Sequence, residues 1–84
     1  MAIRTLVIED NPTNLELMTY LLTAFGHNAI GARTGEEGVR LATETSPDLI
    51  LCDIHLPDID GFETLVRLRH VDEILVQLPA RERR

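Results

Sequence analysis

Leu49-Ile50-Leu51-Cys52-Asp53 is an apolar run that ends at a carboxylate, and it is followed by Ile54-His55-Leu56-Pro57-Asp58-Ile59-Asp60-Gly61. Four consecutive apolar residues predict a strand buried on both faces, as in the centre of a parallel sheet. Open α/β sheets bind ligands at the carboxyl ends of their strands, where Asp53 is expected to lie. Pro57 and Gly61 give the following loop a defined shape. A lone Asp after a strand is more often a cap, so its role depends on other acidic residues.

A second buried strand is predicted at residues 3–8, and it also ends in carboxylates, Glu9 and Asp10. If the two strands are parallel neighbours, their carboxyl ends lie side by side and three acidic groups meet. At about 5 Å and an effective dielectric constant near 20, each pair of like charges repels by about 3 kcal/mol. A hard divalent cation relieves this repulsion, and Mg²⁺ suits so few carboxylates better than Ca²⁺. The sequence therefore predicts a metal site at Glu9, Asp10 and Asp53.

Two helices are predicted between the strands. Asn11-Pro12 is suited to the cap and first position of a helix, and Gly26 to a left-handed terminal cap. The apolar stripe of this helix is expected to pack firmly on the sheet and consists of Leu15, Met18, Leu22 and Phe25, widened by Leu17 and Leu21. A capping box at Thr34 and Glu37 opens the second helix, with Thr34 bonding forward and Glu37 reaching back.

Strands starting near residues 3, 28 and 49 alternate with these helices. The strand near residue 28 is short and poor in β-branched residues, which favours a sheet edge. Parallel strands in sequence require right-handed crossovers, and the natural strand order is then 2-1-3. This is an α/β fold, the first half of a flavodoxin-like parallel sheet with flanking helices. The order makes strands one and three neighbours, as the metal site requires.

The end of the chain, residues 70–84, is compatible with two interpretations. Ile74-Leu75-Val76-Gln77-Leu78 could form a fourth strand. Val71, Ile74, Leu75 and Leu78 also fall at helical spacing, and no Gly or Pro interrupts residues 62–78. We favour one extended C-terminal helix and keep the fourth strand as the alternative.

Two motifs resemble a known family. They are Val7-Ile8-Glu9-Asp10-Asn11-Pro12-Thr13-Asn14 and Pro47-Asp48-Leu49-Ile50-Leu51-Cys52-Asp53, the latter continuing through the loop to Glu63. Together they resemble the receiver domain of two-component response regulators, with an acidic pair after strand one, an Asp after strand three, and Pro and Gly at set offsets. The resemblance covers roughly residues 1–69.

The resemblance implies that Asp53 accepts a phosphoryl group from a histidine kinase or a phosphotransfer protein. It also implies that Mg²⁺ is surrounded by Glu9, Asp10, Asp53 and the main-chain carbonyl of His55. A phosphohydrolase using Asp53 is disfavoured, because the second acid expected two residues later is His55.

Some family features cannot be found in the sequence. By resemblance, a complete receiver has five βα units, a Thr or Ser after strand four and a Lys after strand five. This chain has room for three units and a tail, and all eight of its basic residues are Arg. We therefore interpret residues 1–84 as one truncated receiver-like domain, with 1–69 as its core and 70–84 as a divergent tail. Phosphoryl transfer is expected to be impaired, since its catalysis is mostly positioning and charge stabilisation.

The composition is that of a soluble globular protein, with 44% hydrophobic and 26% charged residues. A net charge of −6 argues against nucleic acid as a partner. No apolar run approaches the length of a membrane span, and the first strand follows the start without a leader. Cys52 is the single cysteine and is expected in the core. A cytoplasmic location is expected.

The leading interpretation is a phosphoacceptor rather than an enzyme, and the alternative is a phosphorylation-independent dimerisation or partner-binding module. A homodimer is expected through the C-terminal segment and an exposed sheet edge. Strand three, at Leu49 to Cys52, would be an unpaired edge, and the face that a fifth helix would cover would be bare. A short heptad seam would add to the interface through Leu68, Val71, Leu75 and Leu78.

Overall fold

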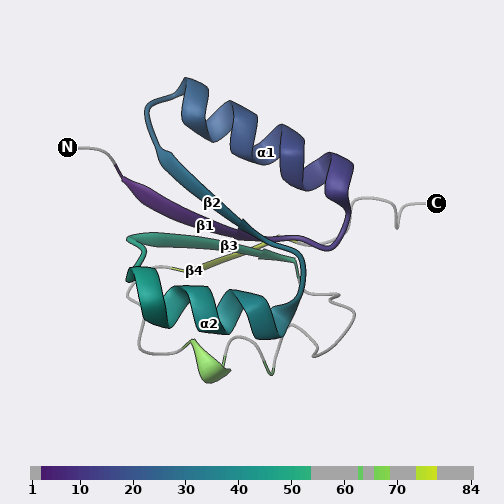
Figure 1. Cartoon of the computed structure of the whole chain (residues 1–84), viewed down its shortest axis with the longest axis vertical. Coiled ribbons are helices and arrows are strands. Elements are labelled where there is room, and N and C mark those ends of the chain that lie inside the picture. Colours follow the sequence, from purple (N-terminus) through teal and green to yellow (C-terminus); the bar gives the residue numbers. More distant parts are fainter. Residues whose placement is uncertain (1–2, 54–62, 64–65, 69–73, 78–84) are drawn as a thin grey trace.

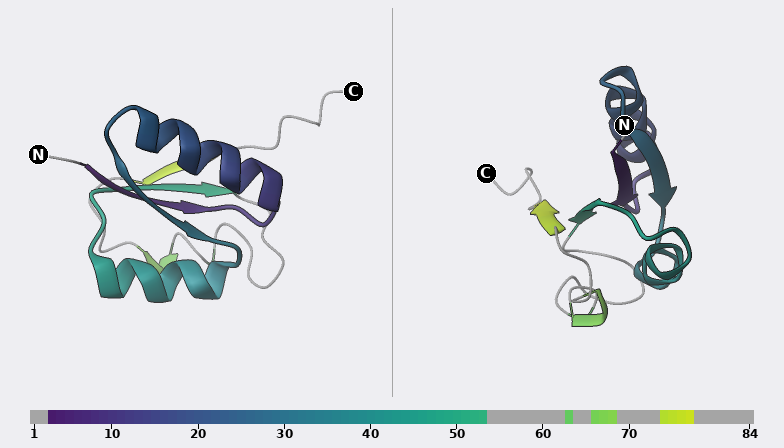
Figure 2. Two further views of the ribbon diagram at one scale, coloured as in Figure 1. Left: turned by 45° about the horizontal axis from the view of Figure 1, so that its top comes forward. Right: turned by 90° about the vertical axis from the view of Figure 1, so that its left-hand side faces the viewer.

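The computed structural model describes residues 3–53, 63, 66–68 and 74–77 of the 84-residue chain. In chain order its elements are β1 (Arg4–Ile8), α1 (Pro12–Ala24), β2 (Asn28–Ala32), α2 (Gly35–Thr45), β3 (Leu49–Asp53) and β4 (Ile74–Gln77). Figures 1 and 2 show the strands between the two helices, with α1 on one side of the sheet and α2 on the other. The predicted α/β alternation is confirmed.

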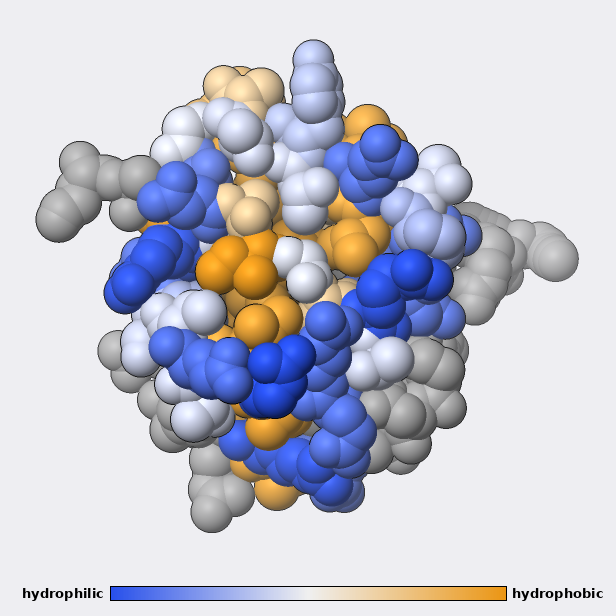
Figure 3. All heavy atoms as spheres, viewed as in Figure 1, coloured by the Kyte–Doolittle hydropathy of each residue, from blue (hydrophilic) through white to orange (hydrophobic). Residues whose placement is uncertain are grey.

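All four strands are parallel and lie in the order β2-β1-β3-β4. β1 is therefore central, with Leu6 aligned with Ile30 of β2 on one side and with Ile50 of β3 on the other. The predicted order 2-1-3 is confirmed. β2 is an edge strand, as its weak strand pattern indicated. Figure 3 shows apolar atoms at the surface between the two helices.

The prediction of an extended C-terminal helix was wrong for residues 74–77, which form β4. This strand pairs with β3 in parallel register, from Ile50 opposite Ile74 to Asp53 opposite Gln77. An apolar run with spacings of three and four also fits a short buried strand, so periodicity could not decide between the two. The backbone groups along the open side of β3 decide it, because a strand satisfies them and a helix cannot.

The pairing of β4 contradicts one premise of the predicted dimer interface, the unpaired edge of β3. β3 is not an unpaired edge, since β4 covers its outer side. Leu68 is fully buried within the core, so it does not belong to an exposed seam. Leu75 lies in β4, while Val71 and Leu78 fall outside the described residues. The predicted heptad seam is therefore wrong at Leu68 and Leu75, and the homodimer itself stays a prediction.

The main core lies between the sheet and α2. Its buried apolar residues are Leu6, Ile8, Ala32, Ala42, Ile50, Cys52 and Leu68, with Ile30, Val39 and Leu41 packed against them. Cys52 is a buried free thiol in this cluster, as predicted. Gly38 lets α2 approach β1 closely, because a Cβ there would lie 2.8 Å from Cγ1 of Ile8.

The opposite face of the sheet is only partly covered. α1 lies over β2 and β1, where the Leu15 side chain packs against Gly31. No residue of α1 is fully buried, and the side chains of Leu17, Leu21 and Phe25 are exposed. The predicted wide apolar stripe was therefore wrong, because only its inner residues face the sheet.

β3 shows the same asymmetry between the two faces of the sheet. Ile50 and Cys52 are buried in the core cluster with Ala42 and Leu68, whereas Leu49 and Leu51 are half-buried. The prediction of a strand buried on both faces was correct for one face only. An uninterrupted apolar run does not reveal whether a helix covers each side.

The predicted helix caps are present, with one difference. Asn11 accepts the N–H of Asn14 at 3.0 Å. Gly26, with φ of +91°, follows the C-cap of α1 in a Schellman motif where the N–H of His27 donates to the carbonyl of Leu22. Thr34 caps α2 by accepting the N–H of Glu37, but the Glu37 carboxylate reaches back to the N–H of Arg33.

We predict that Gly38→Ala lowers the free energy of unfolding by about 1–2 kcal/mol. The added methyl group collides with the Ile8 side chain, and the helical preference of Ala over Gly, about 1 kcal/mol, offsets part of this cost. Urea unfolding measures the change. In an Ile8→Val background the substitution should cost less, because Cδ1 of Ile8 is gone. An equal cost in both backgrounds would contradict the close contact.

Candidate functional site

The carboxyl ends of β1 and β3 meet at one edge of the sheet. Ile8 and Cys52 are aligned across the two strands. The residues that follow them, Glu9 and Asp53, therefore lie next to each other at the carboxyl ends of neighbouring strands. β4 continues this edge, with Gln77 aligned with Asp53. The parallel register thus brings together the backbone of the two acidic segments that the sequence singled out.

Glu9 is held firmly between β1 and α1. It is only 5% exposed, and its backbone N–H donates to the carbonyl oxygen of Ala32 at 2.9 Å. Its Oε2 accepts the backbone N–H of Asn11 at 3.2 Å, and Asn11 in turn caps α1. Asp10, by contrast, is exposed. The end of β1 therefore carries two carboxylates that could be metal ligands: that of Glu9 is buried and held in place, and that of Asp10 is accessible to solvent.

Part of the predicted site lies outside the described residues. Asp53 is described as the last residue of β3 but its side chain is not, and His55 falls in the segment 54–62 that is not described. Among the described residues, no three His, Cys, Asp or Glu side chains gather as metal ligands. The donors present at this edge, Glu9 and Asp10, are carboxylates, which are the ligands that hard cations such as Mg²⁺ prefer. The residues therefore fit the group that the sequence analysis expects.

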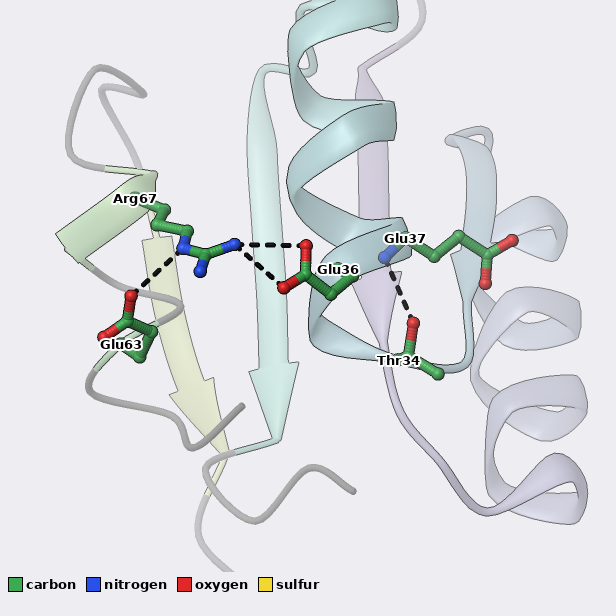
Figure 4. Close-up of polar contacts among 5 residues, drawn as sticks. All are labelled: Thr34, Glu36, Glu37, Glu63 and Arg67. Carbon is green, nitrogen blue, oxygen red and sulfur yellow. Dashed lines mark hydrogen bonds and ion pairs between the residues drawn. The ribbon is translucent and has the colours of Figure 1, made fainter. Parts of the chain in front are cut away.

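Arg67 links the segment after the Asp53 loop to α2 (Figure 4). Its Nη1 lies 3.1 Å from both carboxylate oxygens of Glu36, and its Nε donates to Glu63 at 3.1 Å. The hydrogen bond that the guanidinium donates to Glu63, followed by those that it donates to Glu36, raises the pKa of Arg67. Glu36 lies in the first turn of α2, where a carboxylate also stabilises the amino end of the helix. Glu63 and Arg67 are four residues apart, a spacing that allows pairing on a helix, whereas Glu36 lies 31 residues before Arg67 in the sequence.

His27 lies at the opposite end of the sheet from these carboxylates. Its Nδ1 is 3.0 Å from the hydroxyl of Thr5, a residue that is fully buried at the start of β1. This contact gives His27 a structural role at the start of β1.

With this geometry in place, comparison with known proteins identifies the family. The family model described as the response regulator receiver domain matches residues 5–79, which include all four strands. The chain belongs to the receiver domain family of response regulators. The resemblance inferred from the acidic pair and Asp53 is confirmed.

Two curated relatives of this receiver domain are 42% identical to it. One is the transcriptional regulatory protein AfsQ1 of Streptomyces coelicolor, matched over 77 residues, which are 90% of this chain and 34% of the relative. The other is the polar-differentiation response regulator DivK of Brucella anthropi, matched over 69 residues, 82% of this chain and 56% of the relative. The chain thus spans about a third to a half of these relatives.

A solved structure shows the same architecture. The signal receiver domain of a modulated diguanylate cyclase from Desulfovibrio desulfuricans G20 is 29% identical, with a TM-score of 0.85. The alignment covers 95% of this chain and 67% of that domain. Within the described residues of this chain, no helix has the length and apolar character needed to cross a membrane.

We predict that Arg67→Ala lowers the thermal unfolding midpoint more than Arg40→Ala. Arg67 joins two carboxylates from separate segments, whereas Arg40 pairs only with Glu44 one turn away on α2. Because the pKa of Arg67 is raised, its charged form and its stabilisation persist through neutral pH and are lost only when the pH rises through that pKa. Thermal melts followed by circular dichroism measure both variants.

Added salt should narrow the difference between the two variants, because these charges are exposed to solvent. Equal midpoints at low salt would contradict a linking role for Arg67.

Proposed function

We propose that this receiver domain is a phosphoacceptor in which Asp53 receives a phosphoryl group from a histidine kinase or a phosphotransfer protein. The supporting observation is the register of β1 and β3, which sets Glu9 and Asp53 at the same sheet edge in a member of the receiver family. In this proposal the domain is a substrate of phosphoryl transfer and not an enzyme with turnover on a separate substrate.

The chemistry begins with a carboxylate oxygen of Asp53. This oxygen attacks phosphorus, the bond from phosphorus to the donor histidine nitrogen breaks, and the nitrogen keeps the electron pair and takes up a proton. The product is an acyl phosphate on Asp53, the carboxylate form of nucleophilic catalysis. Mg²⁺, held by Glu9, Asp10, Asp53 and the main-chain carbonyl of His55, would neutralise the charge on the phosphoryl oxygens.

Glu9 has a specific part in this arrangement. Its burial and the hydrogen bond that it accepts from the Asn11 N–H fix its carboxylate at the end of β1. This carboxylate would therefore need no reorganisation to bind a cation. Asp10 is exposed and can bind the cation directly from solvent. The two residues therefore divide positioning from direct ligation.

The chain itself lacks two groups that the family uses to hold the phosphoryl oxygens. The residues after β4, 78–84, include neither Ser nor Thr, and the chain contains no Lys. Losing one preorganised contact of this kind typically costs about 10²–10³ in rate. In the proposal, phosphorylation of these 84 residues is therefore slow and changes the conformation little.

A cytoplasmic location remains a prediction.

The alternative function is a phosphorylation-independent dimerisation or partner-binding module. One observation favours it: the apolar side chains of Leu17 and Leu21 on α1, and of Phe25 at its C-cap, are exposed. The two functions differ in a measurable way, since phosphoacceptance requires Mg²⁺ and Asp53 whereas binding through α1 requires neither.

We predict that Mg²⁺ binds at the carboxyl edge of β1 and β3. Titration followed by amide NMR shifts should move the signals of Glu9, Asp10 and Asp53 most, because three acidic groups lose their mutual repulsion there. A double variant, Glu9→Gln with Asp10→Asn, should abolish the shifts. No response at this edge at millimolar Mg²⁺ would contradict the site.

We predict that a small-molecule phosphodonor with Mg²⁺ adds one phosphoryl group to the chain, slowly, at Asp53. Intact mass spectrometry over time measures the yield and rate. Asp53→Asn should remove the adduct, as should chelation of Mg²⁺. Asp48→Asn is the matched control, because this exposed Asp lies just before the opposite end of the same strand and is bonded to Arg4.

Two outcomes would contradict this account. Labelling that survives Asp53→Asn would assign the phosphoacceptor elsewhere. Labelling as fast as in a complete receiver domain would show that the missing Lys and hydroxyl groups contribute less than about 10²–10³ to the rate of phosphorylation.

A further inference from the structure

We propose that Asn11 is a positioning residue that sets the preference of the cation site for Mg²⁺ over Ca²⁺. The inference rests on the cation site of the proposed function, and it concerns a residue outside the predicted ligand set. Asn11 lies in the turn between β1 and α1, at the sheet edge where β3 also ends (Figure 1). Its role follows from the hydrogen bonds that it makes to the residues on either side of it.

Three restraints fix the backbone of Asn11. Its side-chain Oδ1 accepts the N–H of Asn14 at 3.0 Å, and its carbonyl oxygen accepts the N–H of Leu15 at 2.9 Å. Pro12 follows it, and a residue before proline favours extended backbone, which Asn11 adopts with φ of −83° and ψ of 115°. The start of α1 therefore sets the direction in which the Asn11 N–H points.

This N–H holds the buried carboxylate of the site. It donates to Oε2 of Glu9 at 3.2 Å, and Glu9 is 5% exposed. The backbone of Glu9 is held as well, because its own N–H donates to the carbonyl oxygen of Ala32 at 2.9 Å. Asp10 lies between these two fixed residues, and its side chain is exposed. The placement of both carboxylates at the end of β1 thus depends on Asn11.

The two helices differ in the carboxylates available at their amino ends. α2 has two acidic residues in its first turn, and one of them, Glu37, reaches back to the N–H of Arg33. α1 has no acidic residue in its first turn, where Asn14 occupies the position that corresponds to Glu37. No carboxylate in that turn competes for the Asn11 N–H, which is bonded to Glu9 instead. The positive end of the α1 dipole also favours a carboxylate at this place.

A carboxylate held in one orientation discriminates between the two cations. Mg²⁺ requires near-ideal octahedral geometry, with oxygen ligands at about 2.0–2.1 Å. Ca²⁺ accepts about six to eight oxygen ligands at about 2.3–2.6 Å in flexible geometry. A Glu9 carboxylate fixed by Asn11 therefore favours Mg²⁺, and loosening this carboxylate should weaken Mg²⁺ binding more than Ca²⁺ binding.

The test compares the Mg²⁺ and Ca²⁺ affinities of the whole 84-residue chain and its variants, by titration followed by amide NMR shifts. Asn11→Ala removes the side-chain restraint and keeps the backbone N–H. Mg²⁺ should bind this variant about tenfold more weakly, the lower end of the loss that follows removal of a group supporting a metal ligand. The Ca²⁺ affinity should change by less than about twofold, since Ca²⁺ tolerates a mobile ligand. Asn11→Ser should keep the wild-type ratio of the two affinities, because Ser caps a helix as well as Asn does.

Thr34→Ala is the matched control. Thr34 caps α2 by accepting the N–H of Glu37 at 3.1 Å, so this variant loses a helix cap of the same kind. It should lose a similar amount of stability in urea while keeping the wild-type ratio of Mg²⁺ to Ca²⁺ affinity. A ratio that falls equally in Thr34→Ala and Asn11→Ala would overturn the proposal, because the effect would then come from helix stability alone.

The hydrogen bond between Asn11 and Glu9 can be measured without metal. In the metal-free chain, the Asn11 amide proton should be protected from hydrogen exchange, and Asn11→Ser should retain this protection. Glu9→Ala removes the acceptor and should abolish the protection, as measured by NMR. An Asn11 amide that exchanges equally fast in the wild type and in Glu9→Ala would overturn the proposal.

The role of Asn11 and the proposed function can fail separately. An unchanged affinity ratio in Asn11→Ala, with Mg²⁺ bound by the wild type, would overturn the role of Asn11 and leave the phosphoacceptor in place. A wild-type chain that prefers Mg²⁺ as expected but accepts no phosphoryl group at Asp53 would overturn the proposed function and leave the role of Asn11 in place. A wild-type chain that binds no Mg²⁺ would overturn both.

Discussion

The pairing of β1 on both sides is the constraint on which the molecule depends. Because β2 and β3 flank the same strand in parallel register, the carboxyl ends of β1 and β3 must coincide, and Glu9 is placed beside the end of β3. The same register aligns Leu6 and Ile8 with Ile50 and Cys52, so that these four side chains belong to one core cluster. Site and core therefore follow from a single set of backbone hydrogen bonds.

The sequence predicted what local signals determine. The cap at Asn11, the left-handed turn at Gly26 and the order 2-1-3 each depend on nearby residues or on the rule for crossovers. The strand at Ile74–Gln77 could not be predicted in this way, because its apolar spacing fits a helix equally well. What distinguishes the two is the open side of β3, which is remote in sequence.

In the candidate site, too, only the residues with local sequence signals could be predicted. The acidic residues were recognisable because they follow apolar strands, and the burial of Glu9 agrees with a positioning role. Glu36 was not recognisable as a partner of Arg67, because 31 residues separate them and only the fold brings α2 beside that segment. The exposure of Leu17, Leu21 and Phe25 could not be predicted either, because an apolar stripe in the sequence does not show how many of its residues contact the sheet.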